Sequence, residues 1–147
     1  MSGETIVVFG TQKTLAASGA ATPNGTLAVA GTASYDVVAD GLGFPDGDFA
    51  LSIIFATAPL EGSSLTLYAR PLGIDGANNG EVPETTRPTL FIGSFIVNDV
   101  ITQQYILLTA RDLPRKADYY IHNLGTGQTV SAGWTLKVTP RSYKAAP

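Results

Sequence analysis

Short segments in which apolar and polar side chains alternate recur along most of this chain, and they constrain its fold more than any other feature. The segments 49–55, 65–70 and 134–139 show the alternation most clearly. A period of two puts every second side chain on the same face of a β-strand, so one face of each segment is apolar. The pattern predicts about eight or nine strands and no long amphipathic helix.

The segments between these strands have the composition of tight turns. Pro45-Asp46-Gly47, Glu61-Gly62-Ser63 and Asn79-Gly80 combine residues that favour turn geometry. Many short strands with such turns predict an all-β, antiparallel β-sandwich, with the jelly roll as the preferred topology. An immunoglobulin-like sandwich is the alternative. The Cys-Trp-Cys pattern of immunoglobulin domains is missing because the chain has no cysteine, but other members of that fold also lack this pattern.

The 147 residues fit one domain. We expect an N-terminal strand and a Gly/Ala/Ser/Thr-rich arm over residues 1–33, and the β-sandwich over residues 34–147. The segment 10–34 has too few large side chains to form a core of its own, so it is either a flexible linker or an extended arm. We favour an extended arm that is held by contacts, for which a neighbouring subunit is one candidate surface.

The residue inventory restricts the possible chemistry. Without cysteine there are no disulfides, thiol nucleophiles or thiolate metal sites. The single histidine, His122, is the residue that a Ser-His-Asp hydrolase or a histidine-ligated zinc site would require. The alternation around it instead predicts a polar side chain on the solvent face of a sheet. Local signatures of nucleotide-binding proteins, zincins and α/β-hydrolases are absent. We expect no catalytic residue, no cofactor, no metal and no enzymatic activity.

Two carboxylates can catalyse glycoside hydrolysis without histidine, and carboxylates two residues apart can bind Ca²⁺. Asp40, Asp46 and Asp48 form the densest acidic segment. The spacing of an EF-hand is absent, however, and Asp-Gly pairs are common in turns, so we interpret this segment and the polar segment 73–81 as loops.

Nucleic acid and membrane are both poor candidates as partners. The formal net charge of −3 argues against binding to phosphates. No apolar run approaches the roughly 18 residues of a membrane span, and the first ten residues lack the pattern of a secretory signal.

Two predicted strands, 89–97 and 105–110, have large apolar side chains on both faces. An antiparallel sandwich strand normally keeps one face polar, and each large apolar side chain left in water forgoes about 1.5–3 kcal/mol. The pattern predicts an interaction surface. Its candidate residues, including two from the arm, are Phe91, Phe95, Val97, Tyr105, Leu107, Leu15 and Leu27. Alternatively, the arm or a long loop of the same chain covers these faces. Exchange of the arm between identical subunits would satisfy both the arm and the apolar faces.

The segment 118–140 begins with Asp-Tyr-Tyr-Ile-His-Asn and ends with Gly-Trp-Thr-Leu-Lys-Val-Thr-Pro. These strands, with the Gly/Ser/Thr connection between them, resemble the small jelly-roll decoration (cement) proteins of tailed bacteriophage heads. The rest of the chain resembles them only in its general character. The resemblance implies a structural virion protein on the capsid exterior, assembled in the host cytoplasm. It would bridge major capsid subunits and stabilise the shell, and its partners would be the major capsid protein and itself, as a dimer or trimer.

A carbohydrate-binding β-sandwich, as a receptor-binding or fibre-tip module, is the main functional alternative. Sugar binding requires exposed aromatic rings beside carboxylates and amides. The aromatic candidates are Tyr68, Tyr119, Tyr120 and Trp134, and the polar candidates are Asp46, Asp48 and Asn79. The strand pattern also allows Trp134 and one tyrosine of each adjacent pair to lie in the core.

Overall fold

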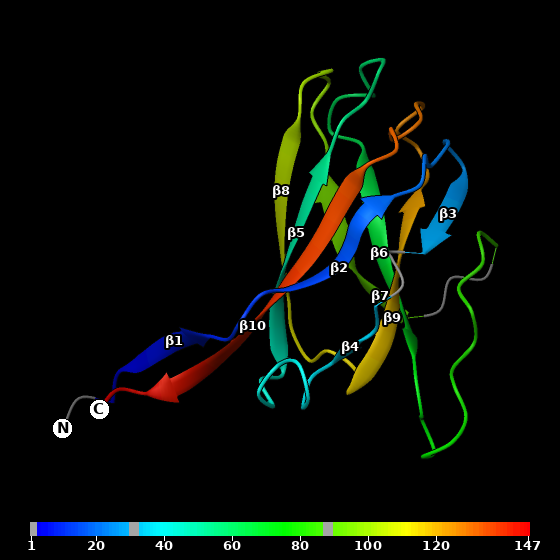
Figure 1. Ribbon diagram of the computed structural model, residues 1–147. Coiled ribbons are helices and arrows are strands. Elements are labelled where there is room, and N and C mark those ends of the chain that lie inside the picture. Colours follow the sequence, from blue (N-terminus) through cyan, green and yellow to red (C-terminus); the bar gives the residue numbers. More distant parts are fainter. Residues whose placement is uncertain (1–2, 30–32, 87–89) are drawn as a thin grey trace.

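The structure, a computed structural model, describes residues 3–29, 33–86 and 90–147, which form two antiparallel sheets packed face to face (Figure 1). The first sheet contains β1 (Thr5–Phe9), β2 (Lys13–Gly19), β5 (Asp46–Ile53), β8 (Gln104–Ala110) and β10 (Trp134–Ala145). The second contains β3 (Thr26–Val29), β4 (Tyr35–Asp36), β6 (Ser64–Pro71), β7 (Leu90–Ile96) and β9 (Lys116–Asn123). No membrane-spanning helix is found among the described residues.

The strand order is that of a jelly roll. It runs β2-β10-β5-β8 in the first sheet and β3-β9-β6-β7 in the second, with β1 beside β10 and β4 beside β9. Early strands therefore pair with late ones, as in a long hairpin whose two arms are rolled up together. The predicted antiparallel β-sandwich is confirmed.

The core lies between the sheets and is built from the alternating positions. In β5, Phe49, Leu51 and Ile53 are buried, while the residues between them are partly exposed. The same pattern recurs in β6 and in the first half of β10. Trp134 is buried, and its Nε1–H donates to Ala20 O at 2.8 Å. These segments confirm the alternation that the sequence predicted.

The predicted arm is held by contacts, and its described strands form part of the chain's own sandwich. β2 pairs with β10 at the edge of the first sheet, and β3 pairs with β9 at the edge of the second. Between them, Thr22 forms a bridge with Val130. The small side chains permit this close packing on the sandwich. Residues 30–32 of the predicted arm lie outside the described residues.

A different segment projects from the sandwich. The last part of β10 continues past β5 and pairs with β1 over the register Thr5↔Ala145 to Phe9↔Arg141. Figure 1 shows these two strands leaving the body together. The sequence predicted that the last strand ends at Thr139, before a proline. It continues because Pro140 still contributes its carbonyl, which accepts the Gly10 N–H at 2.9 Å.

A β-bulge in β7 changes which side chains of that strand face outward. The register runs from Leu67↔Gly93 directly to Tyr68↔Phe91, so Ile92 is an extra residue in β7. On one side of the bulge Phe95 lies opposite Leu65 and faces the core, whereas on the other side Phe91 faces outward. Thr89, where the predicted strand begins, lies outside the described residues.

Candidate interaction surfaces

The single histidine is buried rather than exposed, which corrects the prediction of a solvent-facing side chain. His122 is 4% exposed, lies opposite Leu27 and Thr66 on the neighbouring strands, and has the Tyr68 ring 6.0 Å away. Among the described residues its Nε2 has no hydrogen-bond partner. Burial lowers the pKa of His122 below its usual 6.5. The large neighbours on β3 and β6 account for the burial.

The three acidic side chains of the 40–48 segment each have a partner within the fold. Asp40 binds Lys13 Nζ at 2.7 Å. Burial alone would raise the pKa of Asp40, but the hydrogen bonds from Lys13 and the Asp36 N–H outweigh it and lower the pKa. Asp46 Oδ1 accepts the Asp112 N–H at 3.0 Å. Within residues 3–29, 33–86 and 90–147, no group of three or more His, Asp and Glu side chains is close enough to hold a metal ion.

The polar loop predicted at 73–81 is a loop in the structure. Asp75 closes a tight turn in which its carboxylate accepts the backbone N–H groups of Ala77 and Asn78. With a further hydrogen bond from the Asn78 side chain, these contacts lower the pKa of Asp75 to about 2. The side-chain Oδ1 of Asn79 accepts the Gly73 N–H. The polar side chains of this loop therefore stabilise its own turns.

Of the seven residues predicted for an interface, three are exposed: Tyr105 (82%), Leu107 (65%) and Phe91 (58%). Leu27 is partly buried at the edge of the second sheet. Phe95, Val97 and Leu15 are in the core, so their inclusion was wrong. Phe95 and Val97 face inward because of the register of β7, and Leu15 faces inward because β2 closes the first sheet.

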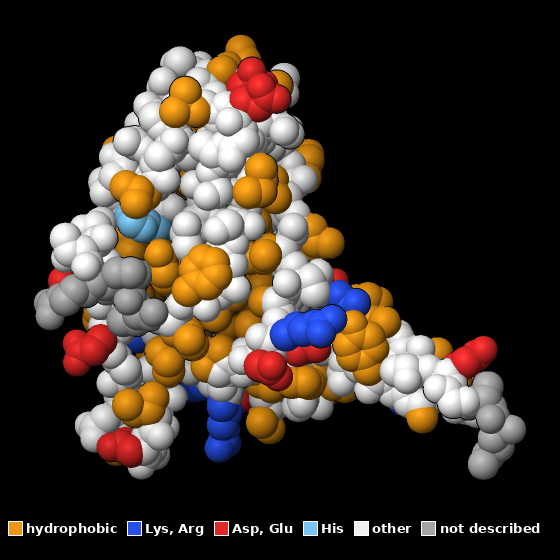
Figure 2. All heavy atoms as spheres, turned by 180° about the vertical axis from the view of Figure 1, so that it is seen from behind, with side chains coloured by type: hydrophobic (Ala, Val, Ile, Leu, Met, Phe, Trp, Pro, Cys, Tyr) orange, Lys and Arg blue, Asp and Glu red, His pale blue; other side chains and the backbone are white. Residues whose placement is uncertain are grey.

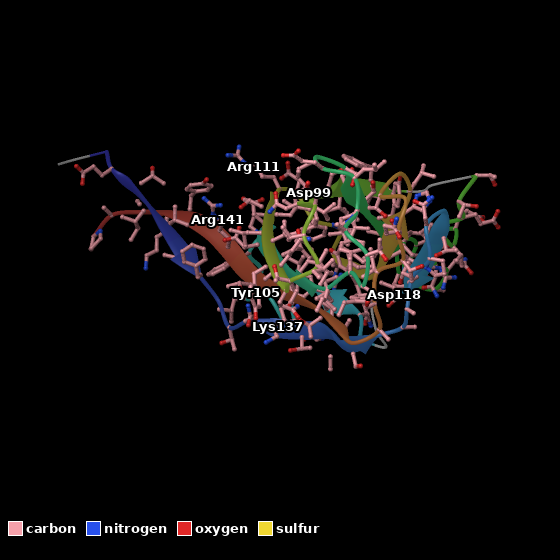
Figure 3. The ribbon with its side chains drawn as sticks, turned by 90° about the horizontal axis from the view of Figure 1, so that it is seen from above. Asp99, Tyr105, Arg111, Asp118, Lys137 and Arg141 are labelled. Carbon is pink, nitrogen blue, oxygen red and sulfur yellow. The ribbon has the colours of Figure 1, made fainter. Side chains whose placement is uncertain are left out.

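Tyr105 and Leu107 form one wall of a shallow groove of about 350 Å³ on the outer face of the first sheet. Ala50 and Ser52 of β5 line it next, followed by the polar side chains of β10 and Gln12. In Figure 3, Tyr105 and Lys137 lie on the same side of the sheet. The groove therefore places an exposed aromatic ring beside hydroxyl, amide and ammonium groups.

A polar network separates this groove from the projecting strands. Asp48 on β5 accepts Thr109 Oγ1–H at 2.8 Å and lies 3.5 Å from Arg141 on β10. Arg141 also donates to the Tyr143 hydroxyl at 3.3 Å, and its guanidinium stacks over that ring with its Cζ 5.6 Å from the centroid. The network connects β5, β8 and β10 at the base of the projection, where Figure 3 labels Arg141.

The projection itself, which we call the β1–β10 ribbon (residues 5–9 and 141–145), is two strands wide, and its β1 strand is largely apolar. Phe9 is 58% exposed and Tyr143 is 47% exposed. They share a face, because Val7 lies opposite Tyr143 and Phe9 lies opposite Arg141. Ile6, on the other face, is also exposed. An isolated two-stranded ribbon is at best marginally stable in water. The sequence predicted an N-terminal strand, which is β1, but did not indicate that it would pair with β10 outside the sandwich.

The outer face of the second sheet has a smaller apolar cluster around Tyr68. Phe91 on β7 packs edge-on against the Tyr68 ring, with the centroids 6.1 Å apart. Ile96 on the same strand is also exposed. Figure 2 shows apolar side chains gathered over the middle of this face, close to the histidine. This face is a second apolar surface.

The aromatic residues considered for sugar binding are mostly unavailable. Trp134, Tyr119 and Tyr120 are buried, and only Tyr68 is partly exposed. Tyr119 packs against Phe49 with their ring centroids 5.0 Å apart, and burial raises its pKa. The three buried rings stabilise the core, so Tyr68 is the one accessible ring among these four candidates.

Comparisons with protein-family models, with curated proteins and with solved structures find no match to the chain. The interpretation of the site therefore depends on its own geometry.

Proposed function

We propose that this protein is a structural virion protein that decorates the outer surface of a bacteriophage head, where it bridges major capsid subunits and stabilises the shell. The single observation that carries the proposal is the amount of large apolar surface left exposed on the first sheet and on the β1–β10 ribbon. Large exposed apolar patches are typical of surfaces that bind other proteins, membranes or ligands, and we infer a protein partner here. The jelly roll is a fold that capsid proteins use, and it supports the proposal at the level of architecture.

The proposed role needs contact surface rather than chemistry. The described carboxylates of the 40–48 segment are engaged in hydrogen bonds or ion pairs, and the single histidine is buried. The exposed side chains at the groove, Tyr105 and Leu107, are instead suited to burial against another protein. Under this proposal the protein performs no turnover, acts on the capsid exterior and is assembled in the host cytoplasm.

Co-sedimentation with undecorated heads tests the proposal. The heads would be assembled from the major capsid protein encoded in the same genome. The wild-type chain should sediment with them, and the double variant Tyr105→Ser/Leu107→Ser should lose at least about tenfold in affinity, equivalent to about 1.4 kcal/mol. Leu124→Ser is a matched control, because Leu124 is as exposed as Leu107 but lies on a loop outside the groove. Equal binding by all three proteins would show that the groove does not contact the shell.

A carbohydrate-binding function is the second candidate, and the groove is the observation that favours it. The exposed ring of Tyr105 lies beside Gln12, Ser52 and Thr135, which together supply a stacking surface with hydrogen-bonding groups. A glycan array separates the two candidates: glycan binding by the wild-type chain that Tyr105→Ala abolishes, without head binding, would replace the capsid role.

A further inference from the structure

The outer edge of β1 is an open strand edge. β1 pairs on one side with β10, and within the described parts of the chain no strand pairs with its other side. An unpaired edge presents a row of N–H and C=O groups that can accept another strand. Beyond Arg141, the far side of β10 is also without a strand partner among these residues, because β5 ends its pairing there.

The hydrogen bonds flanking the ribbon identify which residues face the open edge. The Gly10 N–H donates to Pro140 O, and the Ala146 N–H donates to Glu4 O, both at 2.9 Å. In an antiparallel pair, hydrogen-bonded and non-hydrogen-bonded positions alternate. The even-numbered residues of β1 therefore bond to β10. The N–H and C=O groups of Thr5, Val7 and Phe9 point away from it, toward the open edge.

The sequence of this edge lacks the features by which proteins prevent edge-to-edge pairing. Such edges usually have charged side chains or proline. β1 reads Thr-Ile-Val-Val-Phe, with no charge, no proline and no glycine. Its exposed residues are β-branched or aromatic, which are the types that pair best across strands.

The accessible surface of the chain is larger than a compact monomer of its mass requires. It measures 7801 Å², whereas a folded monomer of 15.3 kDa exposes about 7,100 Å². The excess of roughly 700 Å² reflects the segments that project from the sandwich. Figure 1 shows the β1–β10 ribbon as one of these projecting segments.

We propose that β1 pairs antiparallel with β1 of a second copy of this chain, about a two-fold axis at Val7. Val7 then lies opposite the partner's Val7, and Thr5 lies opposite the partner's Phe9. All three outward-facing residues occupy hydrogen-bonded positions. Two marginal ribbons become one four-stranded sheet, which is wide enough to be stable.

The charges permit this identical partner. About this axis, Glu4 lies opposite the partner's Gly10, so no like charges face each other across the new pairing. A two-fold arrangement is closed and uses the same surface on both copies. The proposal concerns the free protein and holds whether or not the chain decorates a shell.

Proline at the centre of the edge tests the proposal. Val7→Pro removes an outward-facing N–H that the ribbon itself does not use, so the pairing of β1 with β10 is retained. Val7→Ala is the matched control, because it shortens the same side chain and keeps the N–H. Light scattering at micromolar concentrations should give the mass of two chains for the wild type and Val7→Ala, and of one chain for Val7→Pro. A wild-type monomer, a trimer or a Val7→Pro dimer would overturn the proposal.

Cross-linking tests the register and uses the absence of cysteine from the native chain. Opposed residues of a hydrogen-bonded pair have Cα atoms about 5.5 Å apart, within disulfide range. Val7→Cys should form a disulfide-linked dimer on mild oxidation. Thr5→Cys should do so only when mixed with Phe9→Cys. Leu124→Cys, exposed but far from the ribbon in the fold, is the control and should remain uncross-linked. Failure of Val7→Cys to cross-link, or equal cross-linking of Leu124→Cys, would contradict the pairing.

The two proposals fail separately. If the protein is a dimer that does not bind capsids, only the decoration role is refuted. If it is a monomer that binds capsids, only the pairing of β1 is refuted.

Discussion

Gly19 lies against the indole ring of Trp134 so closely that a Cβ at position 19 would overlap with the ring atoms. The contact joins the edge strand β2 to the start of β10, and the Trp134 Nε1–H extends it by donating to Ala20 O. This contact explains why β2, which is poor in large side chains, can form the edge of the first sheet. The backbone of β2 itself covers the Trp134 ring.

Replacing this glycine should therefore destabilise the fold. Gly19→Ala places a methyl group where the indole already lies, and overpacking of this kind costs about 1–3 kcal/mol of unfolding free energy. Denaturant titration followed by tryptophan fluorescence measures the loss. Gly3→Ala is the control, because no atom lies within 4 Å of the corresponding Cβ position. Equal stability of both variants would show that β2 does not pack on Trp134 in this way.

The buried histidine predicts a pH dependence near neutrality. Because the pKa of His122 is lower in the folded chain than its usual 6.5, protonation favours the unfolded state. The stabilisation that comes from keeping His122 neutral is fully present above pH 6.5. It is lost as the pH falls through the lower pKa that His122 has in the folded chain. The unfolding free energy should thus decline below about pH 6.5, whereas His122→Gln should remove the decline in that window. Measurements of the unfolding free energy at closely spaced pH values test this prediction. A variant whose pH profile of stability matches that of the wild type would contradict the burial of the ring.

A separate decline is expected in acid. Hydrogen bonds hold the pKa values of Asp36, Asp40 and Asp75 below the usual 3.8. For such groups the stabilising contribution is present above 3.8 and lost as the pH falls through the folded values, which for Asp75 is about 2. Asp40→Asn should flatten part of this acid dependence and leave the histidine window unchanged. Denaturation curves between about pH 2 and 5 test it, and full acid sensitivity in the variant would assign the effect to other groups.

The ion pair between Asp48 and Arg141 should contribute modestly. Both side chains are partly exposed and the N···O distance is 3.5 Å. A double-mutant cycle with Asp48→Asn and Arg141→Met should give a coupling energy of about 0.2–1 kcal/mol that shrinks in high salt. A coupling of zero in low salt would mean that the network at the base of the ribbon does not hold β5 and β10 together.

The sequence predicted the core well because burial and strand periodicity coincide there. Phe49, Leu51 and Ile53 face inward as their spacing requires. The alternation of side chains along a sequence cannot reveal a bulge, however. In β7 the bulge places Phe91 on the opposite face from the one that a regular period of two predicts. The prediction for Phe95 and Val97 was wrong for the related reason that both faces of the strand are apolar.

The ribbon was missed for a different physical reason. Strand ends are inferred from breakers, and Pro140 is a strong one. Whether a proline ends a strand depends on which of its groups the neighbour needs, and here Gly10 needs only the carbonyl. The exposure of Phe9 and Tyr143 follows from where β5 ends, which is a property of the tertiary structure.

The central claim is that another protein chain covers the apolar surface of the first sheet and its ribbon. Electron cryo-microscopy of heads mixed with the purified chain tests it most directly. The account predicts density on the outside of the shell in which the groove at Tyr105 and Leu107 and the ribbon at Phe9 are buried against protein. Heads that remain bare at saturating concentration, or bound copies with both surfaces facing solvent, would contradict it.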